Sequence, residues 1–139
     1  MPIRLLAIAA LACLAAASAL AAPTAKTSIC GQVKHGPKAT YTSLLLGKKI
    51  SGTTWTVFAT GVQCSSARKA APPILKWWAK AKIESSGTVA GFSCNKESDA
   101  HGSAGSAGCT PLHGKPLANI ELIMTGSMSI AQLKALFGG

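Results

Sequence analysis

The stretch from Trp55 to Cys94 carries the clearest pattern in the chain, and we expect the rest of the fold to form around it. Apolar residues at positions 55, 57 and 59 alternate with threonines at positions 54, 56 and 60. This two-residue period, rich in aromatic and β-branched residues, is typical of a half-buried strand. The apolar positions change parity after Gly61, which predicts a β-bulge at that glycine.

A helical pattern follows this strand. Ser65 or Ser66 can cap it by accepting hydrogen bonds from the free amides of the first turn. The pair Pro72-Pro73 lacks two amide donors and disfavours helical backbone at the residue before it, so it predicts a break. We therefore expect a short helix ending near Ala70 and a second helix from about Pro73 to Ile83, with the proline at its first position.

The second helix is expected to be amphipathic. Its apolar face gathers Ile74, Trp77, Trp78 and Ala81. Lys69, Lys76 and Lys80 fall within a narrow arc on the other side if the helix continues through the prolines. One interpretation is that the tryptophans pack on a sheet and the lysines only solvate the helix. The alternative is that the lysine arc binds an anionic polymer or lipid headgroups.

Further strands are predicted on both sides of this block. Ser85–Gly87 is expected to be a turn, Thr88–Cys94 a strand, and the alternation over Asn119–Met124 another strand. Ser129 caps a short amphipathic helix over residues 130–137, which the two final glycines end. Earlier in the chain we expect a short strand at Ile29–Val33, an edge strand at Tyr41–Leu46 and a basic turn at Gly47–Gly52. Together these elements predict a single α+β domain: a small antiparallel sheet of three to five strands with one main helix packed on it.

The N-terminus has the pattern of a secretory signal peptide over residues 1–21. A short charged start is followed by an uncharged, alanine-rich run from Leu5 to Ala22, and small residues at Ala19–Ala21 suit a signal peptidase. The alternative is an uncleaved membrane anchor, which the run could just span. Cys13 lies within this run and only faintly resembles a lipid-attachment cysteine, so we expect it to be removed. The mature domain is then 22–139, secreted or otherwise outside the cytoplasm.

Processing leaves an even number of cysteines, which in a small exported chain predicts two disulfides. These cysteines are Cys30, Cys64, Cys94 and Cys109. We favour Cys64–Cys94 with Cys30–Cys109, because the first pair would lie at the ends of two strands that flank one helix. The main rival pairs Cys94 with Cys109.

The charge balance is strongly basic, with 14 Lys plus Arg against 4 Asp plus Glu and a formal net charge of +10. Such a field attracts anionic partners, among them cell-envelope polymers, membrane surfaces and acidic proteins. The chain shows no motif for specific nucleic-acid recognition, no Cys-x-x-Cys zinc pair and no glycine-rich phosphate loop. We expect no cofactor and no metal.

Catalysis is not expected either. The residues Asn95 to Gly108 read as a mobile polar loop, so Asp99, His101 and Ser103 within it lack the fixed geometry that a hydrolytic triad needs. Four dispersed histidines and methionines could in principle bind copper, but their spacing is not diagnostic and ordinary surface roles explain them. These are His101, His113, Met124 and Met128.

The order Cys64-Ser65-Ser66-Ala67, helix, Gly91-Phe92-Ser93-Cys94 resembles a set of small exported actinobacterial proteins. The resemblance spans roughly Cys30 to Met124 and implies a fold outline and an extracytoplasmic address, without an assigned activity. The chain also matches the small secreted subtilisin inhibitors in size and in having two disulfides, although their reactive-loop motif is not found here. The hypothesis is thus a non-enzymatic exported protein acting at the cell envelope or outside the cell. Its alternatives are an exported protein-binding or protease-inhibitor module and, from a different class, a small hydrolase.

Overall fold

The computed structural model describes residues 25–44 and 46–138. The predicted signal peptide and Cys13 lie outside these residues. The elements in chain order are β1 (Thr27–Val33), β2 (Ala39–Ser43), β3 (Lys48–Gly52), β4 (Trp55–Thr60), α1 (Cys64–Lys80), β5 (Ser85–Val89), β6 (Phe92–Glu97), β7 (Ser106–Pro111), β8 (Asn119–Met124) and α2 (Ile130–Phe137).

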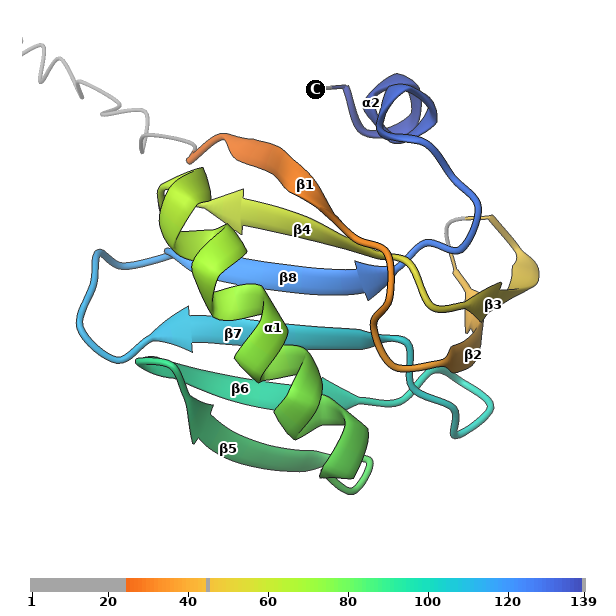
Figure 1. Cartoon of the computed structure of the whole chain (residues 1–139), viewed down its shortest axis with the longest axis horizontal. Coiled ribbons are helices and arrows are strands. Elements are labelled where there is room, and N and C mark those ends of the chain that lie inside the picture. The colour runs from red at the N-terminus through yellow and green to blue at the C-terminus, as the bar shows by residue number, and fades with distance from the viewer. Residues whose placement is uncertain (1–24, 45, 139) are drawn as a thin grey trace, which may run out of the picture.

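Six strands form one antiparallel sheet in the order β1-β4-β8-β7-β6-β5, and α1 crosses one face of it diagonally (Figure 1). The face under α1 is called the inner face below, and the opposite face the outer face. The hairpin of β2 and β3 is a separate two-stranded sheet at one end. This arrangement confirms the predicted α+β class, with more strands than expected. None of the helices described is both long and apolar enough to cross a membrane.

The main core lies between α1 and the inner face. Trp55 of β4 meets Trp78 of α1 edge to face, with ring centroids 4.7 Å apart. Ile120, Leu122 and Met124 of β8 are fully buried beside them, as their alternation predicts. Because every second residue of a strand points to the same face, these apolar positions all reach the helix.

The helix α1 runs without interruption through Pro72 and Pro73, so the predicted break is wrong. Both prolines are exposed, and so are Arg68 and Lys69, whose carbonyls lose the two amide donors. These carbonyls can therefore bond to water, which reduces the cost of a proline within a helix. The buried residues Ala67, Ala70, Ala71, Ile74, Leu75 and Trp78 keep the helical period on both sides of the prolines.

The segment from Ser85 to Glu97 forms a hairpin rather than a turn followed by one strand. Its two strands, β5 and β6, are joined at Ala90 and Gly91, whose φ angles are 51° and 83°. Positive φ at both central residues is the mark of the tight turn that suits strand twist. Gly87, expected in a turn, instead lies in β5, where it leaves room for the ring of Trp77.

Two other local predictions are also wrong. The basic segment Lys48–Gly52 is strand β3, which pairs with β2 in register. Gly61 is a turn residue with φ of 63° just after β4, and the bulge lies in β1 between Ile29 and Gly31. The C-terminal helix is confirmed, with a reciprocal capping box between Ser129 and Gln132.

The two disulfides join Cys30 to Cys64 and Cys94 to Cys109. Two bridges are confirmed, but the favoured pairing is wrong and the rival Cys94–Cys109 bridge is the one observed. The strand order explains both. β1 lies beside β4, so Cys30 lies close to the residue that begins α1 just after β4. Cys94 and Cys109 are directly opposite each other on β6 and β7.

Candidate ligand-binding groove

Helix α2 lies against the outer face, and a polar network that is partly buried holds the linker that leads to it. The side-chain amide of Gln32 donates to the Met128 carbonyl at 2.9 Å and to the Thr56 hydroxyl at 3.2 Å. The Thr56 and Thr125 hydroxyls are 2.7 Å apart and fully enclosed. Because buried polar groups are costly without partners, this network holds the linker in one place.

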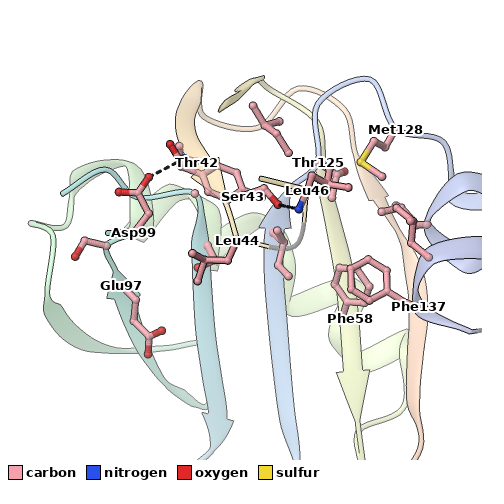
Figure 2. A pocket seen from close by; sticks show the side chains of 18 residues that line it. Thr42, Ser43, Leu44, Leu46, Phe58, Glu97, Asp99, Thr125, Met128 and Phe137 are labelled. Carbon is pink, nitrogen blue, oxygen red and sulfur yellow. Dashed lines mark hydrogen bonds between the residues drawn. The ribbon is translucent and has the colours of Figure 1, made fainter. Parts of the chain in front are cut away.

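A groove of about 350 Å³ lies between the outer face, α2 and the β2–β3 hairpin (Figure 2). Its apolar wall includes Leu44, Ile50, Phe58, Ile123, Leu136 and Phe137. Phe58 and Phe137 meet edge to face at 5.4 Å, which joins β4 to α2. The volume lies within the range of small-molecule sites.

Large apolar side chains remain exposed at this groove. Leu44 is 87% exposed, and Leu136 and Phe137 are each 49% exposed. Leu133 of α2, by contrast, is buried and anchors the helix to the sheet. Convergence of exposed apolar side chains on a concave site is typical of surfaces that bind a partner or ligand.

Asp99 organises the polar end of the groove. One carboxylate oxygen accepts the amides of His101 and Ser103, and the other accepts the Thr42 amide of β2 at 2.7 Å. These bonds, the one from Thr42 above all, hold the pKa of Asp99 below its usual value. The predicted mobile loop therefore shrinks to residues 98–105, and this loop is tied to β2 through Asp99.

The ring of Tyr41, in the hairpin, packs against Gly105 at the end of the loop. A Cβ atom built on Gly105 would lie 2.0 Å from Cδ1 of Tyr41, so only glycine leaves room for the ring. Burial raises the pKa of the Tyr41 phenol above 10.0. The aromatic ring thus forms part of the groove wall at neutral pH as an uncharged side chain.

Glu97 supplies a second carboxylate at this end. It is exposed at the end of β6, opposite Ser106 of β7 on the outer face. Figure 2 shows Glu97 and Asp99 on one side of the groove, with Phe58 and Phe137 on the other. In the part of the chain that the structure describes, no lysine or arginine lines the groove.

The lysine arc predicted from the sequence lies elsewhere. Lys69, Lys76 and Lys80 are all exposed on α1, which covers the inner face, so they point away from the groove. Trp77 is half-buried against Gly87, and Trp78 is buried. The structure thus places the lysine arc and the groove on opposite sides of the sheet.

The other candidate residues do not assemble into a site. The Asp99 oxygens accept main-chain amides of the loop that contains His101 and Ser103. Met124 is buried on the inner face, whereas Met128 lines the groove on the outer side. Within residues 25–44 and 46–138, no three His, Cys, Asp or Glu side chains gather closely enough to hold a metal ion.

Neither a protein-family model nor a curated protein nor a solved structure matches this chain. The groove is therefore characterised from its own geometry. Sequence reasoning missed it because its wall comes from segments far apart in the chain. The apolar C-terminal tail gave a signal in the sequence, since it could dock on the domain or serve as a contact surface; in the structure it docks on the sheet through Leu133 and Phe137.

Proposed function

We propose that this disulfide-stabilised protein is an exported, non-enzymatic binding protein that acts at the cell envelope or outside the cell, and that the groove holds its ligand. The observation that carries this proposal is the convergence of exposed Leu44, Leu136 and Phe137 on one concave site. Exposing such side chains to water is unfavourable by about 25 cal/mol per Å² of apolar surface, and a bound apolar group would recover part of it.

Export is supported by the apolar, alanine-rich start of the sequence and by the two disulfides. Disulfides persist in oxidising compartments and are rare in the cytosol. The resemblance to small exported actinobacterial proteins agrees with a location outside the cytoplasm. A binding role, rather than hydrolysis, is favoured because the Asp99 carboxylate already accepts three main-chain amides.

Binding of the neutral dye Nile red tests the groove. The double variant Leu44→Ser/Leu136→Ser should bind the dye at least tenfold more weakly than the wild type. The matched control is Leu112→Ser/Leu117→Ser, which removes two leucines of similar exposure, 48% and 80%, that do not line the groove. The proposal fails if the wild type does not bind the dye, or if both double variants lose binding equally.

The lysine arc supports a second candidate function, adhesion to an anionic envelope polymer or membrane surface. Its three lysines are exposed along a helix that contains no acidic residue. Binding through several charges should weaken steeply with salt, since the Debye length falls from ~10 Å at 0.1 M to ~3 Å at 1 M. Sedimentation with anionic vesicles tests this adhesion.

The triple variant Lys69→Gln/Lys76→Gln/Lys80→Gln should lose most sedimentation with the vesicles. The variant Lys38→Gln/Lys48→Gln/Lys49→Gln removes the same charge from exposed sites outside α1 and should retain it. Equal loss in both variants would show that net charge alone, not the arc, carries the adhesion. Absence of binding at low salt would remove this second function.

A further inference from the structure

We infer that the groove takes a cationic amphiphile, a small molecule with an apolar body and a protonated amine. The body would lie against Phe58 and Leu44, and the amine would face Glu97. This inference rests on the proposed function, because it names the chemical class of ligand for the same groove.

Among the residues that line the groove, the balance of charge is the reverse of that on the whole protein, whereas Lys48 and Lys49 lie on the adjacent strand β3, opposite the lining residues Ser43 and Thr42. The chain has 14 basic and 4 acidic residues, yet two of the acidic residues line the groove, and none of the basic residues within 25–44 and 46–138 does. A third carboxylate, that of Glu84, lies nearby and accepts the amide of the lining residue Ser98 at 2.8 Å. The local field at this end of the groove therefore favours a cation, although the net field of the protein repels one.

The lysine next to Glu97 in the chain does not neutralise it. Lys96 points to the inner face, where its ammonium donates to the carbonyls of Trp78 and Ala81. Strand alternation thus separates the two neighbouring charges onto opposite faces of the sheet. The Glu97 carboxylate stays on the outer face at the rim of the groove.

Glu97 is better placed than Asp99 to bond directly to an amine. The Asp99 oxygens already accept three main-chain amides, so this residue contributes mainly its negative charge. Glu97 is exposed at the end of a strand, and its side chain can reach a ligand above Ser106 and Ile123. An ammonium–carboxylate contact here would be charge-assisted and about twice as strong as a neutral hydrogen bond.

The same geometry selects against anionic amphiphiles. A fatty-acid carboxylate in the groove would lie near the like charges of Glu97 and Asp99, and none of the described residues that line the groove is a cation that could offset the repulsion. Anionic compounds should instead associate with the exposed lysines of α1, on the other side of the molecule.

Three ligands with the same ten-carbon chain test the inference: decylamine, decanol and decanoate, each below its micelle concentration at neutral pH and 0.15 M salt. We expect decylamine to displace Nile red from the wild type at a concentration at least tenfold lower than decanoate. In Glu97→Gln, the concentration of decanoate that displaces the dye should be less than threefold higher than that of decylamine. The matched control Glu121→Gln removes an exposed carboxylate from the same sheet face that does not line the groove, and should keep the wild-type ratio.

The outcomes distinguish a failure of the cationic preference from a failure of the proposed ligand-binding function. If decanoate competes as well as decylamine, or if Glu97→Gln keeps the wild-type ratio, the cationic preference is overturned. Displacement by decanol would then still support an apolar groove. If none of the three compounds displaces the dye, the groove is not a ligand site and both proposals fail.

Discussion

The ammonium of Lys96 lies 4.0 Å from the ring centre of Trp78 and donates hydrogen bonds of 2.8 Å and 2.9 Å to the carbonyls of Trp78 and Ala81. Trp78 lies in the last turn of α1 and Ala81 is its C-cap, where helices leave carbonyls without internal partners and carry a partial negative charge. A strand of the sheet therefore caps the helix that covers it. Burial lowers the pKa of Lys96, and the carbonyls and the ring offset the cost of burying the charge.

Replacing Lys96 should destabilise the domain. Lys96→Met keeps most of the apolar stem but leaves the two carbonyls without their donor, so the free energy of unfolding should fall by about 1 to 3 kcal/mol. Urea unfolding measures this change. Lys115→Met, at an exposed site, should change it by less than about 0.5 kcal/mol. Equal effects at both sites would show that Lys96 does not cap the helix.

Asp99 should make the protein sensitive to acid. Its pKa in the folded state lies below the ordinary 3.8, chiefly because Thr42 and then Ser103 donate to it. The unfolded state therefore binds more protons in this range. The stabilisation is fully present above the unfolded pKa and is lost as pH falls through the folded pKa. Glu84, whose pKa the Ser98 hydroxyl and amide lower from 4.5, acts in the same direction.

Thermal melts between about pH 5 and pH 2 test this linkage. The wild-type melting temperature should fall across the range, and Asp99→Asn should melt at a lower temperature at pH 7 and decline less steeply in acid. Parallel curves for the two proteins would contradict the role assigned to Asp99.

The disulfides should differ in their contribution to stability. A chain-entropy model assigns about 4 kcal/mol to the Cys30–Cys64 bridge and about 3 kcal/mol to Cys94–Cys109, because their sequence separations are 34 and 15 residues. Paired Cys→Ser variants measured by chemical unfolding test this order. Peptide mapping without reduction should recover both links, and a Cys64–Cys94 link would contradict the strand order.

Gly105 should be intolerant of substitution. Gly105→Ala would place a methyl group where the Tyr41 ring lies, so we expect a loss of about 1 to 3 kcal/mol in the free energy of unfolding and weaker binding of Nile red. Gly108→Ala is the matched control, since nothing lies within 4 Å of its Cβ position. That variant should be unchanged or slightly more stable. Similar losses in both variants would show that the contact with Tyr41 does not limit position 105.

Local residue patterns predicted the strands and helices that have a clear periodicity or a capping residue within their own sequence. The alternation through Trp55 and Val57, and the cap at Ser129, were enough for β4 and α2. The prediction of a break at the prolines was wrong because the rule that proline interrupts a helix does not consider which side of the helix the proline occupies. Pro72 and Pro73 both face solvent. The period of buried residues across them was the better guide.

Long-range features could not be predicted in the same way. The disulfide pairing depends on β1 lying beside β4, which nothing local to Cys30 or Cys64 encodes. The groove depends on Leu44 and Phe137 reaching the same face of the sheet. Both are properties of strand order and packing, which follow from the whole chain.

The most direct test of the central claim is a titration with decanol followed by two-dimensional amide NMR of the folded protein. We predict that the shifted resonances will concentrate at Phe58, Ile123 and Phe137, which line the groove, and that Ile74 and Trp78 on the far side of the sheet will hardly move. Shifts centred on α1, or no saturable shifts at all, would contradict the assignment of the groove as the ligand site.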